Sequence, residues 1–233
     1  MKLNGISSNI LPELEDTLVF TDDEIGDEHI STSVDTPLRP DAFEMSDEDK
    51  KAKIEYHFRH IMETLGLDLT DDSLKGTPKR VAKMYIDEIF SGLNPENKPR
   101  IALFENKYQY NGMLVEKNIT FYSNCEHHFV PIFGKAHLAY ISNGKVIGLS
   151  KLNRIVQYFA KRPQVQERLT MQIAKELRNI LQTEDIAVLI DAKHLCVSSR
   201  GIKDESSATV TSYYGGQFLQ ENVRQEFLSN IAL

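Results

Sequence analysis

The strongest constraint on the fold of this chain is a change of hydrophobic periodicity along the sequence. Apolar residues recur at the three-to-four-residue spacing of helices in residues 46–68, 76–93, 149–162, 164–182 and 220–231. The period of two, or the apolar and β-branched character, of strands marks residues 118–123, 134–142, 145–150, 185–199 and 207–214. Strands and helices grouped in this way predict an α+β fold, with helices covering one face of a mainly antiparallel sheet.

Local signals predict where several of these elements begin. Ser46, Thr77 and Ser150 each precede a helical pattern and are expected to be N-caps, because a hydroxyl oxygen can accept a hydrogen bond from the first turn. The dipeptide Asn143-Gly144 separates two strand-like segments and is a strong hairpin signal. We therefore expect the segments on either side of it to pair.

Charge divides the chain into two parts. Residues 1–50 contain 14 acidic and 3 basic residues, a net charge of −11, whereas the remaining residues contain 20 acidic and 24 basic residues, a net charge of +4. The composition of residues 1–46 predicts a mobile acidic arm, followed by a folded domain over residues 47–233. The small basic excess of residues 51–233 excludes non-specific nucleic-acid binding but suits a pocket for a small anion.

The sequence also predicts a compartment. Residues 1–16 show no basic start followed by an apolar run, so no secretory signal is expected. No window approaches the ~18 consecutive apolar residues that would span a bilayer. We expect a soluble, cytoplasmic protein without a membrane partner, in which thiols stay reduced.

Histidines accompany both cysteines of the chain. Cys125 and His128 have a Cys-x-x-His spacing at the end of a predicted strand, where a turn can bring them together, and Cys196 follows His194 by two residues. Residues two apart in a strand share a face. Thiolate and imidazole are zinc ligands, and three protein ligands with an open position are typical of a catalytic site. The pattern therefore predicts zinc bound by Cys125, His128 and Cys196.

Two further histidines lie beside these ligand candidates. His127 and His194 could act as acid or base, since an imidazole with a pKa near neutrality is the usual proton carrier. Spacing alone leaves open which histidines bind the metal and which move protons. A structural zinc site that recruits a fourth ligand is the alternative to a catalytic one.

Basic residues near helix starts suggest an anion site. Lys151 and Arg154 lie in the first turn of a predicted helix, where unpaired N–H groups attract anions. Arg200 follows Cys196 by four residues, and Arg80 lies early in its own helix. Each would ordinarily be a solvated charge, but as a group beside a metal they suggest phosphate binding.

Glu167 allows two interpretations. An acidic residue in the first turn of a helix is usually a partner of the helix dipole. A carboxylate is also the acceptor pair that matches the N1–H and 2-amino donors of guanine.

Several long segments together are similar to the GTP cyclohydrolase I family. They are residues 76–85, 123–141, 148–170, 193–204 and 207–216. The resemblance extends from about Asp47 to the C-terminus. It implies the tunnelling fold, with a helical hairpin over residues 47–95 and a T-fold part over residues 111–233, whose antiparallel four-stranded sheet joins those of other subunits into a barrel. The family's members are similar homodecamers with active sites between subunits.

The resemblance implies a zinc-dependent enzyme with one zinc ion per subunit. It would hydrolyse GTP to 7,8-dihydroneopterin triphosphate, the first step of tetrahydrofolate and pterin biosynthesis, by opening the purine ring at C8 and releasing formate. Cys125, His128 and Cys196 would bind the metal, and His127 and His194 would transfer protons. The implied substrate contacts are Glu167 and Gln166 at guanine, Ser150 near the ribose, and Lys151, Arg154, Arg200 and a neighbouring subunit's Arg80 at the triphosphate.

Two other functions compete with this one. A related tunnelling-fold enzyme, such as a nitrile reductase, would use a nucleophilic cysteine and no metal, which two Cys/His clusters disfavour. A non-catalytic oligomer stabilised by zinc would hold a coordinatively saturated metal.

Overall fold

The computed structural model describes residues 33–232, so residues 1–32, which hold most of the predicted acidic arm, and Leu233 lie outside the described residues. Residues 33–46 contain a turn at residues 40–44 and neither a helix nor a strand. Between residues 33 and 232, none of the helices combines the length and the apolar character that crossing a membrane requires.

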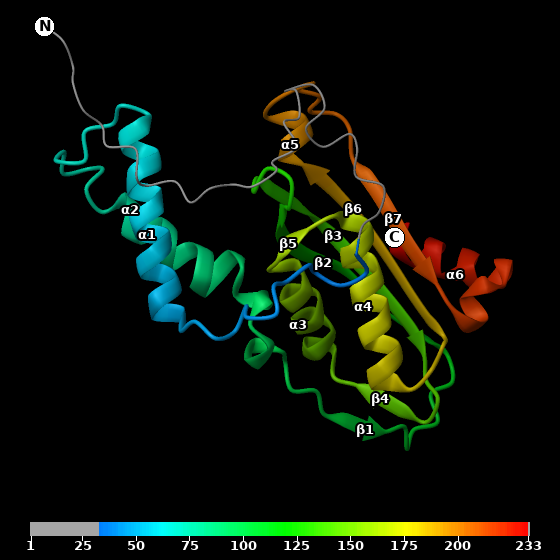
Figure 1. The fold of residues 1–233 in the computed structure, drawn as a ribbon. Coiled ribbons are helices and arrows are strands. Elements are labelled where there is room, and N and C mark those ends of the chain that lie inside the picture. Colours follow the sequence, from blue (N-terminus) through cyan, green and yellow to red (C-terminus); the bar gives the residue numbers. More distant parts are fainter. Residues whose placement is uncertain (1–32, 233) are drawn as a thin grey trace, which may run out of the picture. The chain divides into compact units, whose positions relative to one another are not determined.

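Most helices and strands follow one another in the order that periodicity predicts (Figure 1). The helices are α1 (Asp47–Thr64), α2 (Thr77–Met84), α3 (Leu149–Ala160), α4 (Gln166–Leu181), α5 (Leu195–Ser198) and α6 (Glu221–Ala232). Shorter helical turns are η1 (Tyr85–Ile89), η2 (Ser91–Leu93), η3 (Pro95–Asn97) and η4 (Gly216–Leu219). The strands are β1 (Leu103–Glu105), β2 (Met113–Cys125), β3 (Pro131–Ile141), β4 (Lys145–Ile147), β5 (Pro163–Gln164), β6 (Ile186–His194) and β7 (Thr209–Tyr214).

The helix starts test the predicted caps. Ser46 caps α1 as predicted, because its hydroxyl accepts a hydrogen bond from the first turn at 3.1 Å. Thr77 and Ser150 lie inside α2 and α3, whose N-caps are Gly76 and Gly148 without a side-chain cap, so these two predictions were wrong. Glycine is itself an acceptable N-cap residue, so a hydroxyl residue near the start of a helix does not by itself mark the cap.

A sheet with the strand order β5-β2-β3-β6-β7 forms the centre of the fold (Figure 1). The four longer strands pair antiparallel, and β5 adds a two-residue parallel pairing at the end of β2. The α+β class is therefore confirmed, but the sheet has five strands instead of the predicted four. A strand as short as β5 shows no period of two, so periodicity could not reveal it.

The predicted hairpin at Asn143-Gly144 was wrong. The chain bends there, with Gly144 at a φ of 82°, but β4 pairs antiparallel with β1 and not with β3. Both edges of β3 are already occupied by β2 and β6. A turn signal shows where the chain reverses, but it does not show which strand edges are free.

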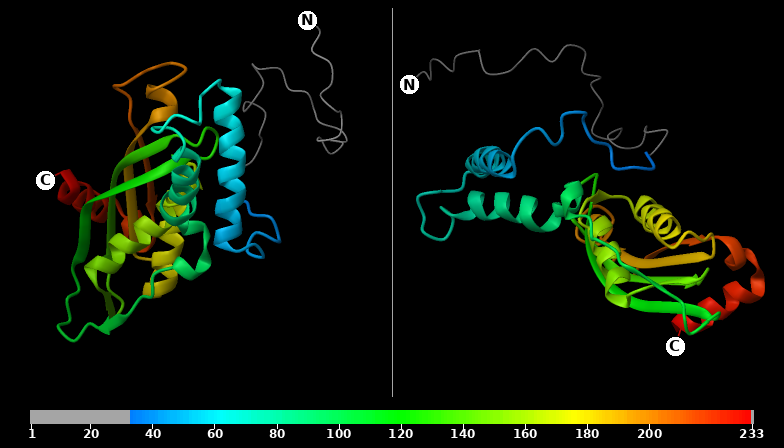
Figure 2. Two further views of the ribbon diagram at one scale, coloured as in Figure 1. Left: turned by 90° about the vertical axis from the view of Figure 1, so that its left-hand side faces the viewer. Right: turned by 90° about the horizontal axis from the view of Figure 1, so that it is seen from below.

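Helices cover both faces of the sheet, where the prediction placed them on one (Figure 2). α3 and α4 pack over one face, in a core that includes Phe121, Leu138 and Val188. On the other face, η4 and α6 pack against Ala139 and Ala187. Alternate residues of β3 and β6 thus belong to two different cores, and the small alanines leave room for aromatic rings of η4 and α6.

Candidate metal centre and active site

Three ligand-type side chains meet where β2 ends and β6 gives way to α5. One ligand atom each of Cys125, His128 and Cys196 lies within 4.8 Å of the others. Cys125 is buried and Cys196 is partly buried, and neither thiol forms a disulfide. The structure therefore brings together the three residues that the sequence predicts as zinc ligands.

The turn between β2 and β3 brings Cys125 and His128 together. The N–H of Cys125 donates to the carbonyl of Val130 at 2.8 Å, and the N–H of Phe129 donates to the carbonyl of Cys125 at 2.8 Å. Phe129 has a left-handed backbone with a φ of 52°, which few residues with a side chain adopt. These contacts close a tight turn, so positions i and i+3 converge as predicted.

Cys196 reaches the group from a helical turn and not from a strand. β6 ends at His194, and both the N–H and the hydroxyl of Ser199 donate to the carbonyl of Leu195, at 2.9 and 2.6 Å, which stabilises the α5 turn. The prediction that His194 and Cys196 share a strand face was therefore wrong, although Cys196 still joins the metal group. An apolar run does not show where a strand ends.

The two thiols favour a bound cation. Burial raises the pKa of the Cys196 thiol, and the nearby Cys125 raises it further. Deprotonating this thiol therefore costs more free energy than usual. A divalent cation offsets that cost, because the thiolate is the form that binds metal. Two sulfur ligands and one imidazole suit zinc by their chemistry.

His194 is held by a buried amide. Its Nε2 lies 2.7 Å from Oε1 of Gln166, whose side chain is almost fully buried. The amide nitrogen of Gln166 faces three acceptors, which are the carbonyls of Ile190 and Thr209 and the hydroxyl of Thr211, at 3.1, 2.8 and 3.1 Å. The amide oxygen of Gln166 therefore faces the imidazole ring. Nε2 of His194 thus carries a hydrogen and donates a hydrogen bond to this oxygen.

His127 lies beside the metal group. Its Nδ1 is 3.6 Å from Sγ of Cys125, and its Nε2 is 4.0 Å from the carboxylate of Glu126. The side chain is 43% exposed. An imidazole that is partly open to solvent and adjacent to a thiol and a carboxylate is placed to exchange protons.

Glu167 lies in the first turn of α4 with its side chain exposed. Burial lowers the pKa of His194, and the charge of Glu167 opposes this shift, which places the carboxylate within electrostatic range of the ring. The carboxylate and the histidine predicted to transfer protons thus lie on the same side of the site.

The residues predicted to bind phosphate lie in different parts of the structure. Nη1 of Arg200 donates to Nε2 of His128 at 2.9 Å, so Arg200 lies beside the metal group. Arg80 instead donates within its own helical hairpin, to the carbonyl of Ser73 at 3.2 Å and the hydroxyl of Thr77 at 2.9 Å.

The start of α3, which carries Ser150, Lys151 and Arg154, lies far from the metal group of the same chain. Asn153, in this turn, donates to the carboxylate of Glu116 at 3.0 Å. Glu116 precedes Cys125 by nine residues in β2, which is roughly 30 Å at ~3.3 Å per residue. A single chain therefore does not bring these three residues to the metal group.

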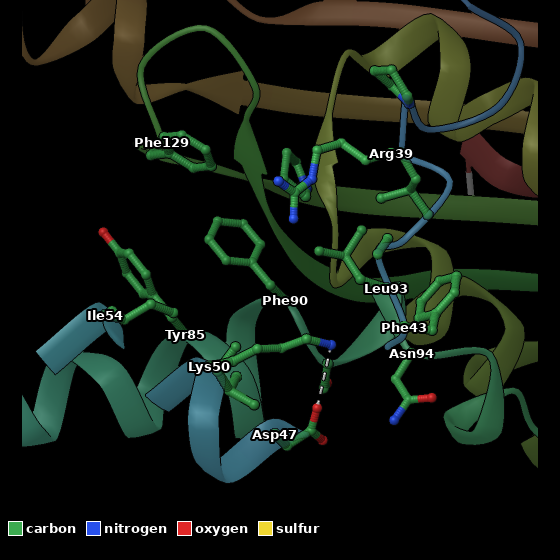
Figure 3. Close-up of a pocket in the computed structure, with 16 residues that line it drawn as sticks. Arg39, Phe43, Asp47, Lys50, Ile54, Tyr85, Phe90, Leu93, Asn94 and Phe129 are labelled. Carbon is green, nitrogen blue, oxygen red and sulfur yellow. Dashed lines mark ion pairs between the residues drawn. The ribbon is translucent and has the colours of Figure 1, made fainter. Parts of the chain in front are cut away.

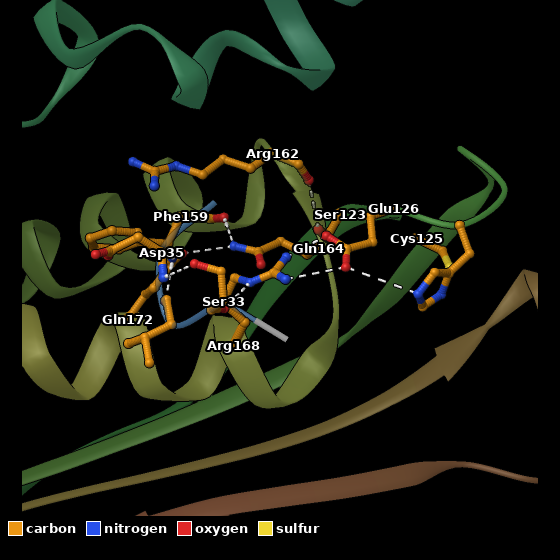
Figure 4. A network of polar contacts seen from close by, with 12 residues as sticks. Ser33, Asp35, Ser123, Cys125, Glu126, Phe159, Arg162, Gln164, Arg168 and Gln172 are labelled. Carbon is orange, nitrogen blue, oxygen red and sulfur yellow. Dashed lines mark hydrogen bonds and ion pairs between the residues drawn. The ribbon is translucent and has the colours of Figure 1, made fainter. Parts of the chain in front are cut away.

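Sequence reasoning missed Arg168, which follows Glu167 in α4. Its guanidinium binds both carboxylate oxygens of Glu126, with Nη2 at 3.2 Å from Oε1, and its Nε donates to the carbonyl of Ser33 at 2.8 Å (Figure 4). In the sequence, Glu126 is an acidic residue inside the Cys-x-x-His motif and Arg168 is a basic residue next to Glu167. Nothing in the sequence shows that the two are close in space.

A separate cavity of about 450 Å³ lies between residues 37–43, α1 and η1 (Figure 3). None of the predicted site residues lines it. Phe129, which follows His128, borders the cavity, and its ring makes an edge contact with Phe90 at 5.3 Å between centroids. The cavity thus touches the metal-binding turn from outside the site.

Comparison with known proteins gives consistent matches. A family model described as GTP cyclohydrolase I matches residues 54–232. The chain is 63% identical over 211 residues to "GTP cyclohydrolase 1" of Flavobacterium johnsoniae, with 91% of this chain and 95% of the relative covered. It is 55% identical over 200 residues to proteins of the same name from Citrobacter koseri and Escherichia coli O1:K1 / APEC, with 85% of this chain and 90% of each relative covered. The chain belongs to the GTP cyclohydrolase I family.

Proposed function

We propose that this protein converts GTP to 7,8-dihydroneopterin triphosphate, the first step of tetrahydrofolate and pterin biosynthesis. The reaction opens the purine ring at C8, releases formate, and recloses the rearranged ribose onto the freed amine. The observation that carries the proposal is the Cys125, His128 and Cys196 group in a chain that is 63% identical to a GTP cyclohydrolase 1 over 91% of its length.

Cys125, His128 and Cys196 would hold one zinc ion per subunit. Two sulfurs and an imidazole nitrogen within 4.8 Å of one another match the ligand types and the number of protein ligands in catalytic zinc sites. A zinc ion bound there would supply a Lewis acid that lowers the pKa of a coordinated water to about 7.

His127 and His194 move protons. As water adds to C8, a histidine protonates N7, because the electrons of the opening ring need an acceptor. His194 donates from Nε2 to Gln166, which leaves Nδ1 as its basic nitrogen. His127, at 3.6 Å from the thiol of Cys125, lies where a proton released by the attacking water can be taken up.

Glu167 binds guanine. Its exposed carboxylate has one accepting oxygen for each of the two guanine donors, N1–H and the 2-amino group, whereas an amide side chain has a single accepting oxygen. Gln166 is also assigned to the guanine end of the pocket, where its side chain supports His194. These contacts fix C8 near the metal, and positioning of this kind can supply several kcal/mol (about 7–11 in favourable cases).

The triphosphate is bound by residues from more than one subunit. Arg200 lies at the metal group of its own chain, whereas Lys151 and Arg154, with Ser150 near the ribose, start a helix roughly 30 Å along β2 from Cys125. A neighbouring subunit's Arg80 completes the cationic set. Membership of the GTP cyclohydrolase I family supports a homodecamer of the tunnelling-fold type, in which sheets join into a barrel and the active sites lie between subunits.

One assay tests the function. The zinc-loaded protein incubated with GTP is expected to release formate and to give a product that becomes a fluorescent pterin after oxidation. A Cys196→Ser variant should lose zinc and formate release together while it stays folded. Absence of formate from a fully zinc-loaded, oligomeric preparation would reject the proposal.

The alternatives predict different results. A metal-independent nitrile reductase would keep its own reductase activity after zinc removal. A zinc-stabilised non-catalytic oligomer would release no formate at all. The identity to relatives named GTP cyclohydrolase 1 favours neither alternative.

A further inference from the structure

The first turn of α4 contacts both segments that carry the metal group. Gln166, at 1% exposure, holds His194, which precedes Cys196 by two residues. Arg168, at 4% exposure, holds Glu126, which directly follows Cys125. The two contacts come from residues on either side of Glu167, so one rigid helical turn connects both parts of the site to the proposed guanine contact.

The contact of Arg168 with Glu126 has the geometry of a positioning interaction. The guanidinium binds both carboxylate oxygens at once, a planar arrangement that restricts rotation as well as distance (Figure 4). The side chain of Arg168 is 3% exposed and that of Glu126 is 21% exposed, so water competes weakly for either group. The backbone N–H of Glu126 also donates to the carbonyl of Gln164 at 3.0 Å, which fixes the turn from the backbone side.

We propose that Arg168 is a positioning residue of the metal centre. Through Glu126 it fixes the turn that carries Cys125 and His128, relative to the helix that also holds His194. This proposal rests on the metal site of the proposed function, and it assigns to Arg168 no contact with substrate or metal. Groups that orient metal ligands from outside the ligand set typically change metal affinity or activity by about 10–100-fold when they are removed.

The competing explanation is that the ion pair only stabilises the fold. Removing one partner of a buried pair leaves the other charge unpaired, which destabilises a protein whatever the role of the pair. Arg168→Met alone therefore does not separate the two explanations. The double variant Glu126→Gln/Arg168→Met does, because it removes both charges and leaves none unpaired.

The test measures zinc affinity of the full-length apo-protein by competition with a chelator, and the absorption spectrum of the cobalt-loaded protein. Glu126→Gln/Arg168→Met is expected to unfold near the temperature of the parent protein but to bind zinc about 10–100-fold more weakly, with a changed cobalt spectrum. Arg168→Lys should fall in between, because an ammonium keeps the charge but cannot bind both oxygens in a fixed plane.

Arg178→Met is the matched control. Arg178 lies on the same helix and pairs with Glu184 at 2.6 Å, but both side chains are at the surface. Its removal should leave zinc affinity and the cobalt spectrum unchanged. Parental zinc affinity and an unchanged spectrum in the folded double variant would overturn the proposal. Because the assay uses no GTP, that outcome is distinct from a failure of the proposed activity.

Discussion

At the scale of residues, three consecutive positions of α4 have different roles. Gln166 and Arg168 are buried and hold other segments of the chain, whereas Glu167 between them is exposed. Successive side chains on a helix point about 100° apart, because a turn contains ~3.6 residues. One turn can therefore present a single carboxylate to a ligand while its neighbours fix the surrounding structure.

His127→Ala is expected to keep its zinc and its affinity for GTP, because His127 is not among the three proposed ligands. Formate release should fall by about 10²–10⁴-fold, the usual contribution of a positioned acid or base. Zinc content, GTP binding and formate are measured on the same preparation. His57→Ala, an exposed position on α1, is the control. Near-parental formate release would remove His127 from the mechanism.

Glu167→Gln is expected to reduce the preference for GTP over ITP, which lacks the 2-amino group. A carboxamide has one accepting oxygen where the carboxylate has two, so it cannot pair a separate oxygen with each guanine donor. A hydrogen bond to a charged group is worth about 1.5–3 kcal/mol. The measurement is the ratio of kcat/KM for the two nucleotides. Glu221→Gln, another exposed acid in a first helical turn, should leave this ratio unchanged. An unaltered ratio in Glu167→Gln would mean that Glu167 serves only the helix dipole.

At the scale of elements, local pattern identified most helices and strands, because burial of one face imposes a period that is visible in a single sequence. Three of the errors share a physical cause. The end of β6 before Cys196, the partner of β4 and the face covered by α6 all depend on contacts between residues far apart in the chain. The metal group was predicted because two short motifs carried it, whereas the pair of Arg168 and Glu126 spans 42 residues and leaves no local signal.

Phe227→Ala tests the second face of the sheet. Phe227 is fully buried, and its ring lies 6.0 Å from that of Phe218. Its loss should lower the free energy of unfolding by about 3–5 kcal/mol, as expected for a large-to-small change in a core. Urea unfolding of the parent and the variant measures this difference, with the exposed Glu226→Ala on α6 as control. A change below about 1 kcal/mol would mean that α6 contributes little to the fold.

At the scale of the whole molecule, the separation of α3 from the metal group predicts shared active sites. Cys196→Ser and Lys151→Ala should each be inactive when expressed alone. Co-expressed in equal amounts, they should regain about one quarter of the parental activity, because random assembly places an intact metal group beside an intact α3 at that fraction of head-to-tail contacts. Formate release by the purified mixed oligomer is the measurement. No recovery in verified mixed oligomers would show that each site is built from one chain.

The sheet offers two different edges for such an assembly. In the part of the chain that the structure describes, β7 pairs only with β6, and the outer edge of β2 is paired only at Asn124 and Cys125, by β5. Because the two edges differ, subunits that pair through them join head to tail. Every junction in a closed ring of this kind is then the same. In the proposed ring, a substitution at either edge would therefore be repeated at each junction, so a small weakening of one contact would be multiplied by the number of subunits.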